Sequence, residues 1–168
     1  MNSTKGGMMS SKIAIYPGTF DPITNGHFDI IERSLNLFGK VIIAVALSKD
    51  KQTMFTLDER VAMVKKCVSH LLHVEVIGFD NLTVEIAKEF NATALIRGLR
   101  AVSDFEYELQ LSYLNSSLDN TIETIFLMPK LENSYISSSS VRALIKFSKN
   151  PSHLIPKEIA QELSCTLQ

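Results

Sequence analysis

The side chains best suited to chemistry in this chain are hydrogen-bond donors that follow apolar stretches of sequence. They are Thr19, His27, Lys51, Arg97, Arg100 and the serines Ser137, Ser138 and Ser139. Convergent donors with few obvious bases suit phosphoryl or nucleotidyl transfer, in which positioning and charge stabilisation supply most of the catalysis. An acceptor that is itself a phosphate is ionised near neutral pH and needs no general base. The donors therefore predict chemistry on phosphate groups.

The segment KIAIYPGTFDPITNGHFD, residues 12–29, is the most informative part of the chain. Its apolar run at 13–16 predicts a buried strand, which Pro17 and Gly18 are expected to end, because proline lacks a backbone donor and glycine permits a tight turn. A helix is expected from Gly26 onward, with His27 in its first turn. Free N–H groups and the helix dipole favour an anion there, so His27 is placed to touch phosphate.

Each of these donors also has a simpler explanation. His27 alone would more often only cap a helix, Lys51 in a polar loop is usually solvated, and Arg100 could be a surface charge. The serine run could be no more than a loop and a helix cap. Arg97 is harder to dismiss, because an arginine directly after an apolar strand usually has an anionic partner. Neither a G-x-x-x-x-G-K-[ST] loop nor a G-x-G-x-x-G motif is present.

Apolar stretches that alternate with helical patterns predict an α/β fold: a single-domain, doubly wound (Rossmann-like) five-stranded parallel sheet with helices on both faces. The expected strands are 13–16, 41–46, 73–79, 93–96 and 122–128, and the expected helices begin near residues 26, 56, 84, 104, 141 and 156. Such sheets bind ligands beyond the carboxyl ends of their strands, where the strand order reverses. The candidate donors all follow predicted strands, as this rule requires.

Composition sets the outer limits of function. The chain has 168 residues and a net charge of -1, so no broad electrostatic field recruits nucleic acid or an anionic membrane. No apolar run is long enough to span a bilayer. Residues 1–11 predict a flexible tail and 12–168 one domain, with Met8 or Met9 as alternative starts to Met1. Two cysteines with no metal-like spacing fit reduced thiols in the cytoplasm.

The motifs resemble a known family. Residues 18–22 and 25–27 look like the nucleotide-binding signature of the nucleotidyltransferases, with their T-x-x-H and GH elements. Residues 16–27 are similar to bacterial phosphopantetheine adenylyltransferases almost residue for residue. Further matching motifs lie at residues 54–57, 96–108, 126–129 and 136–139, so the resemblance covers roughly residues 12–145.

The resemblance implies adenylyl transfer from ATP to 4'-phosphopantetheine, giving 3'-dephospho-coenzyme A and pyrophosphate in coenzyme A biosynthesis. It also implies Mg²⁺ bound through the ATP phosphates with no metal ligand from the protein, a cytoplasmic homohexamer, and room for feedback binding of coenzyme A. No nucleic acid or membrane partner is expected.

The same resemblance assigns residues to roles. It gives catalytic roles to His27, Thr19, Lys51 and Arg100, and acceptor binding to Thr19, Lys51, Thr83 and Arg97. It gives ATP binding to Thr19, Phe20, His27, Gly98, Leu99, Arg100, Glu108, Asn133, Ser134, Tyr135, Ile136, Ser137, Ser138 and Ser139. The chain departs from the family pattern at Asn81, Thr83 and Asn133, which puts local substrate contacts in doubt and not the reaction class.

Three rival functions fit parts of the pattern. A nucleotidyltransferase of the same fold could use nicotinamide mononucleotide or a cytidylyl donor, but the Arg97-Gly98-Leu99-Arg100 block argues against it. A noncatalytic nucleotide sensor would not need His27 together with Lys51 and Arg97. A tRNA-linked enzyme with a GH-type signature would need a recognition domain for which this chain has no room.

Overall fold

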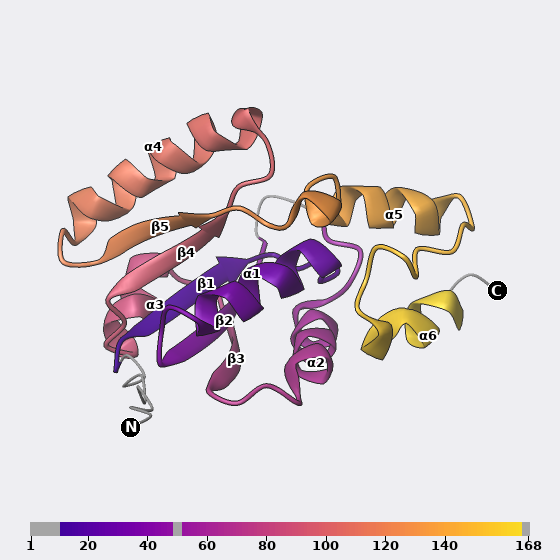
Figure 1. The fold of residues 1–168 in the computed structure, drawn as a ribbon, viewed down its shortest axis with the longest axis horizontal. Helices are drawn as coiled ribbons and strands as arrows, with labels where there is room; N and C mark the ends of the chain where they lie inside the picture. Colours follow the sequence, from indigo (N-terminus) through magenta and orange to yellow (C-terminus); the bar gives the residue numbers. More distant parts are fainter. Residues whose placement is uncertain (1–10, 49–51, 166–168) are drawn as a thin grey trace, which may run out of the picture.

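A parallel five-stranded sheet forms the centre of the protein (Figure 1). The computed structural model describes residues 11–48 and 52–165. The strands lie in the order β3-β2-β1-β4-β5 and are β1 Ile13–Gly18, β2 Lys40–Ala46, β3 Val74–Phe79, β4 Ala94–Gly98 and β5 Glu123–Leu127. This arrangement confirms the predicted doubly wound α/β fold, with the strand order reversing between β1 and β4.

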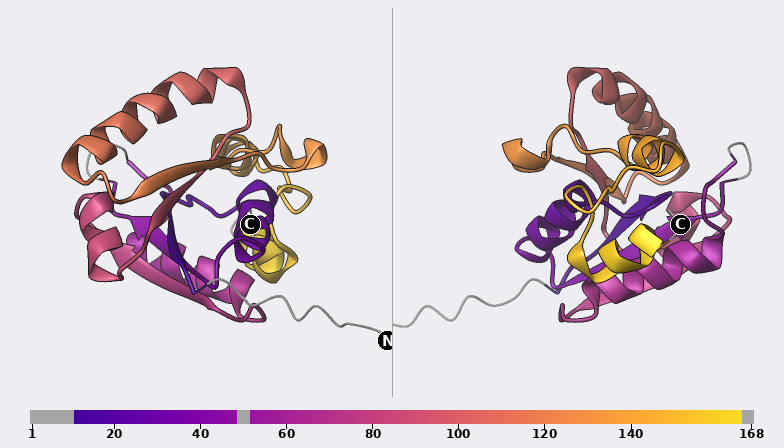
Figure 2. Two further views of the ribbon diagram at one scale, coloured as in Figure 1. Left: turned by 60° about the vertical axis from the view of Figure 1, so that its left-hand side comes forward. Right: turned by 90° about the vertical axis from the view of Figure 1, so that its right-hand side faces the viewer.

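Helices cover both faces of the sheet (Figure 2). They are α1 Asn25–Leu35, α2 Leu57–Val68, α3 Thr83–Glu89, α4 Val102–Leu118, α5 Ser138–Lys146 and α6 Lys157–Cys165, with a 3₁₀ turn η1 at Leu131–Asn133. Successive residues of a strand point to opposite faces. Ala14 and Ile43 therefore pack in one apolar core beneath α1, α2 and α6, while Ile15 and Ile42 pack in the other beneath α3.

The longest helix, α4, differs from the others because both of its sides carry apolar residues. Phe105 packs edge-on against Phe126 of β5, with ring centroids 5.8 Å apart. Tyr107, Tyr113 and Leu114 are more than half exposed. No helix within residues 11–48 and 52–165 is long and apolar enough to cross a membrane.

The two central strands separate toward their carboxyl ends. Within the described chain, β1 pairs with β2 at six positions but with β4 only at Ala14–Ala94 and Ile15–Leu95. Beyond these pairs no backbone ladder closes the gap between the two strands. The reversal of strand order thus opens a space above the middle of the sheet.

Contrary to the prediction, β1 does not end at Tyr16 but continues through Pro17 and Gly18. The Ile13 carbonyl accepts from the Thr93 N–H on the β4 side, and alternate residues of a strand face the same neighbour. Pro17 therefore also faces β4, and its carbonyl accepts from Arg97 Nη1 at 3.3 Å. Its missing N–H would point into the gap, so the strand loses no ladder bond there.

Helix α5 begins at Ser138, three residues before the predicted start. Ser137 is its N-cap, and its hydroxyl accepts from the Ser140 N–H at 3.0 Å. A serine in this role satisfies one of the free donors of the first turn. The serine run is therefore part of the helix start and not a loop before it.

A buried arginine joins the loops at the carboxyl end of the sheet. Arg60 of α2 is 1% exposed. It donates to the carbonyls of Thr19 at 2.5 Å, Ala46 at 2.8 Å and Phe55 at 3.1 Å. One guanidinium therefore fixes the ends of the loops that follow β1 and β2, including the loop that leads to α1.

Replacing Arg60 with Met is expected to destabilise the protein because three carbonyls lose their donor. An unsatisfied buried acceptor costs about 1–3 kcal/mol, so the free energy of unfolding in urea should fall by about 3 kcal/mol or more. Lys66→Met is the matched control, since Lys66 is 54% exposed in its pair with Glu162 and should change stability by less than about 1 kcal/mol. Equal losses in both variants would contradict this role for Arg60.

Candidate active site

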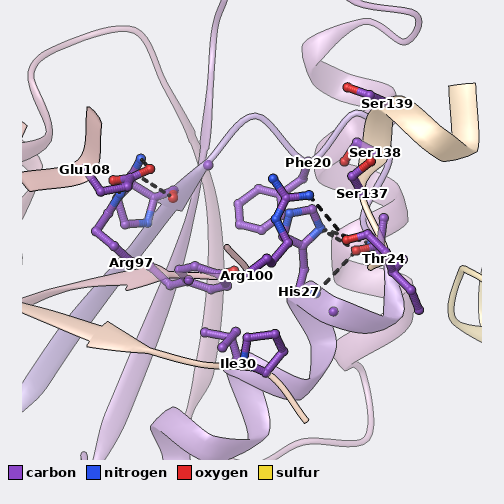
Figure 3. A pocket seen from close by; sticks show the side chains of 17 residues that line it. Phe20, Thr24, His27, Ile30, Arg97, Arg100, Glu108, Ser137, Ser138 and Ser139 are labelled. Carbon is purple, nitrogen blue, oxygen red and sulfur yellow. Dashed lines mark hydrogen bonds and ion pairs between the residues drawn. The ribbon is translucent and has the colours of Figure 1, made fainter. Parts of the chain in front are cut away.

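A cavity lies where β1 and β4 separate (Figure 3). The ends of both strands, the first turn of α1 and the start of α5 line it. It contains many of the predicted site residues: Phe20, His27, Arg97, Gly98, Arg100, Glu108, Ile136, Ser137, Ser138 and Ser139. Segments as far apart in sequence as Tyr16 and Ser139 thus meet at one place, as the switch-point rule predicts.

His27 is held by a capping box at the start of α1. The Thr24 hydroxyl accepts from the His27 N–H at 3.3 Å, and the Thr24 N–H donates to His27 Nδ1 at 3.1 Å. The imidazole takes the place that Glu or Gln usually has in such a box. Because Nδ1 accepts a backbone N–H, the proton of the neutral ring is on Nε2. Among the described residues Nε2 has no partner, so it is free to donate into the cavity.

The surroundings keep His27 neutral. Burial, followed by the nearby Arg100 charge, lowers the pKa of His27 from 6.5 to about 4. Its place in the first helical turn works in the same direction, since the helix dipole opposes a positive charge there. Near neutral pH, His27 is therefore a neutral N–H donor and not a cation.

The first turns of α1 and α5 both end at the cavity. The carbonyl oxygens of Asn133 and Ile136 lie 3.4 and 3.7 Å from where a Cβ on Gly26 would be, so the segment before α5 packs directly against the start of α1. Ser138 donates to the Pro22 carbonyl at 2.8 Å and ties α5 to the loop before α1. Two positive helix ends side by side make a site for an anion.

Two arginines supply the charge of the cavity, and each is paired with an acid of α4. Arg97 donates from Nε and Nη2 to the two oxygens of Glu108, at 2.5 and 2.7 Å. Arg100 lies 3.3 Å from Asp104 and donates to the Ile136 carbonyl at 3.4 Å. Arg97 is thus held by a two-point contact, whereas Arg100 has longer and more exposed ones.

Phe20 packs against the base of the site in a strained conformation. Its φ angle of 48° lies in the left-handed region that favours glycine. The ring packs edge-on against Tyr16 and His27, with centroids 5.4 and 5.0 Å away. A Cβ on Gly18 would lie 2.9 Å from this ring, so Gly18 is required for the close approach and not for a turn with positive φ.

The structure also places residues in the cavity that the sequence analysis did not select. Tyr16, Thr24 and Ile30 line it. Burial raises the pKa of Tyr16, so the phenol stays protonated. Tyr16 was hidden within an apolar run, whereas the spacing of Thr24 and His27 is that of a capping box and could have been recognised with histidine as the acceptor.

Asp21 is a further residue that the sequence analysis missed, and it anchors the loop after β1. Its carboxylate is 3% exposed and accepts from the N–H groups of Met54 and Phe55 at 2.9 and 3.0 Å. Arg142 of α5 lies 3.5 Å from the same carboxylate and donates to the Asp21 carbonyl at 2.7 Å. Asp21 therefore connects the loop after β1, the segment before α2, and α5.

Other predicted site residues lie elsewhere. Thr19 is exposed and does not line the cavity, although its carbonyl is held by Arg60. Thr83 begins α3 at the end of β3, away from the cavity lining. Leu99, Asn133, Ser134 and Tyr135 adjoin the cavity residues without lining it. Lys51 lies outside the described residues, as do residues 1–10 of the predicted tail.

No protein-built metal centre is found in the described part of the chain. Within residues 11–48 and 52–165, no three His, Cys, Asp or Glu side chains gather closely enough to hold an ion. Glu108 is the one carboxylate among the described residues that line the cavity, and both of its oxygens are bonded to Arg97. The donor set fits anionic groups better than a bare cation.

Comparisons with known proteins show which family the chain belongs to. A family model described as Cytidylyltransferase-like matches residues 15–144. Phosphopantetheine adenylyltransferase of Nautilia profundicola is 59% identical over 89% of this chain and 97% of its own length. The Helicobacter pylori (strain 26695) and Campylobacter hominis enzymes of the same name are 54% and 57% identical, over 88% and 86% of this chain and 94% and 91% of their own lengths.

A solved structure from Vibrio parahaemolyticus, assigned as a nicotinate-nucleotide adenylyltransferase, has a similar fold. Its TM-score is 0.71, and the match covers 95% of each chain at 20% sequence identity. At this identity the likeness concerns the fold alone.

The neutral state of His27 predicts how stability depends on pH. With a pKa of 6.5 when unfolded and about 4 when folded, the unfolded chain binds a proton that the folded chain does not. The free energy of unfolding should therefore fall as the pH falls through this window. Between about pH 7 and pH 4.5 the native chain should lose about 1–3 kcal/mol more than a His27→Gln variant, as measured by urea unfolding.

Glutamine is the appropriate replacement because it keeps a side-chain acceptor for the Thr24 N–H and does not titrate. The other ionisable groups are shared by the two proteins and cancel in the comparison. Equal losses for both proteins would mean that His27 titrates normally in the fold.

Proposed function

The chain belongs to the cytidylyltransferase-like family and, within it, to the phosphopantetheine adenylyltransferases, and we propose that the cavity between β1 and β4 is its active site. The enzyme transfers the adenylyl group of ATP to 4'-phosphopantetheine, giving 3'-dephospho-coenzyme A and pyrophosphate. This reaction is a step of coenzyme A biosynthesis.

One observation carries the assignment of the site: the first turns of α1 and α5, the neutral His27 and Arg100 all face one cavity. Helix N-termini and guanidinium groups are the protein's strongest means of holding a polyphosphate. The serine run and Arg100 therefore bind the ATP phosphates, and the apolar surface of Ile30 and Phe20 adjoins them. The opposite end of the cavity, near Arg97, remains for the acceptor (Figure 3).

In this reaction an oxygen of the acceptor phosphate attacks the α-phosphorus of ATP. A new P–O bond forms as the bond from the α-phosphorus to the bridging oxygen breaks, and pyrophosphate carries away the electron pair. His27 donates its Nε2 proton as a hydrogen bond to an oxygen of the α-phosphate without losing it. A donor that is already oriented stabilises the charge that develops in the transition state.

Arg97 holds the acceptor phosphate at the other end of the cavity. A guanidinium group binds phosphate through two parallel hydrogen bonds, which fixes direction as well as charge. We propose that Lys51, which lies outside the described residues, assists Arg97 in binding this phosphate. Thr19 and Thr83, which do not line the cavity, are proposed to contact other parts of the acceptor. These roles rest on the family resemblance.

We propose that Mg²⁺ enters on the ATP phosphates. Glu108, the one carboxylate among the described residues that line the cavity, is occupied by Arg97, so the phosphate oxygens are the better ligands for a small, hard cation. When bound, the ion would offset negative charge on the phosphates and on the leaving pyrophosphate.

A homohexamer, a cytoplasmic setting and feedback binding by coenzyme A are proposed on the family resemblance. The homohexamer has some support in the fold, because exposed aromatic and aliphatic side chains gather on α4. They are Tyr107, Tyr113, Leu114 and Leu118, which are between 48% and 68% exposed. An exposed apolar helix face of this kind marks a contact surface. The mass of the assembly in solution tests it.

The reaction itself is tested by measuring pyrophosphate release from ATP with and without 4'-phosphopantetheine. Release should depend on this acceptor, and nicotinamide mononucleotide at the same concentration should give none. ATP binding by folded protein without any acceptor-dependent release would indicate a nucleotide sensor and overturn the assignment.

The role of His27 is tested by His27→Ala. Because the contact strengthens only as the α-phosphate reacts, kcat should fall by about 100- to 1000-fold while ATP binding weakens much less. Circular dichroism would verify folding, since the variant also loses the capping contact to Thr24. A folded variant with near-normal kcat would remove His27 from the mechanism.

A further inference from the structure

Glu108 lines the cavity, and both oxygens of its carboxylate accept hydrogen bonds from one neighbour, Arg97. Arg97 Nε donates to one oxygen at 2.5 Å and Nη2 to the other at 2.7 Å. The pair is mostly shielded from water, since the two side chains are 23% and 14% exposed. Figure 3 shows it at the end of the cavity opposite the serine run.

The geometry of the pair decides which edge of the Arg97 guanidinium group a ligand can reach. A guanidinium group has two edges that can each form two parallel hydrogen bonds, Nε with Nη2 and Nη1 with Nη2. Glu108 occupies the first edge. Among the described residues, the second makes only a long contact from Nη1 to the Pro17 carbonyl, at 3.3 Å, which a phosphate oxygen can replace.

We propose that Glu108 is a positioning residue for the acceptor phosphate: it holds one edge of Arg97 and thereby orients the Nη1–Nη2 edge toward that phosphate. This inference rests on the proposed function, in which Arg97 takes the acceptor. It differs from the ATP contact that the family resemblance assigns to Glu108, because here the carboxylate acts on the other substrate and through another residue.

The neighbouring acid of the same helix provides a contrast. Asp104 lies one turn earlier on α4 and pairs with Arg100 at 3.3 Å, with side chains 29% and 40% exposed. This longer, wetter contact leaves Arg100 free to adjust to the ATP phosphates. The rigid pair is the one at the acceptor end, where a two-point contact with a single phosphate requires a fixed plane.

Charge and position predict opposite effects, which makes the proposal testable. A carboxylate beside an acceptor phosphate repels it, so a Glu108 that acted only through its charge would weaken acceptor binding, and its removal would improve it. A Glu108 that positions Arg97 strengthens acceptor binding, and its removal would weaken it. The sign of the change in acceptor KM therefore separates the two roles.

The experiment compares Glu108→Ala and Glu108→Gln in the full chain, with KM measured for each substrate at saturation of the other. Glutamine keeps one acceptor oxygen for Arg97, whereas alanine keeps none. We expect acceptor KM to rise about tenfold or more in the alanine variant and about threefold in the glutamine variant, with ATP KM within about twofold.

Two controls separate positioning from a general effect on α4. Glu106→Ala removes an exposed carboxylate of the same helix and should leave both KM values unchanged. An Arg97→Lys variant lacks the guanidinium group that binds two oxygens at once. In that variant, Glu108→Ala should change acceptor KM little further, because the two residues act as one unit.

Unchanged or lower acceptor KM in both Glu108 variants would overturn the inference, as would a rise confined to ATP KM. Additive effects of Glu108→Ala and Arg97→Lys would do the same. Absence of acceptor-dependent turnover in the unmodified chain would instead count against the proposed function, so the two failures are distinguishable.

Discussion

The incomplete pairing of β1 with β4 is the constraint on which the site depends. The two strands share a ladder only at Ala14–Ala94 and Ile15–Leu95 and then diverge, because the connections on either side lead to opposite directions across the sheet. The gap places the ends of both strands at the cavity. It also explains why Pro17 is tolerated inside a central strand, since its missing donor faces no partner there.

Within this gap the positive side chains are largely neutralised by acidic partners or by loss of their proton. His27 is neutral, Arg97 is matched by Glu108, and Arg100 has a looser, more exposed partner in Asp104. Much of the positive potential therefore comes from the two helix ends and from Arg100. Backbone dipoles and paired side chains keep their geometry when phosphates bind and leave, so little reorganisation accompanies the reaction.

Buried polar anchors, together with apolar side chains such as Phe20 and Ile23, hold the loops that carry this site. Arg60 joins the carbonyls of Thr19 and Ala46, where the loops after β1 and β2 begin, and Asp21 joins the same region to the segment before α2 and to α5. Both side chains are almost fully buried, where an unmet hydrogen bond is costly. The loops are thereby held at defined positions around the cavity.

Local patterns in the sequence determined the five strands, the fold class and the place of His27 at a helix start, because strand and helix periods and caps depend on residues a few positions apart. The serine run was likewise visible, although Ser137 proved to cap a helix that begins earlier than expected. Only the tertiary structure decided that Arg97 is bonded to Glu108, that Tyr16 lines the cavity, and that Thr19 does not. Those outcomes depend on how far neighbouring strands diverge and on which of several partners a long side chain reaches, and neither has a signature in nearby residues.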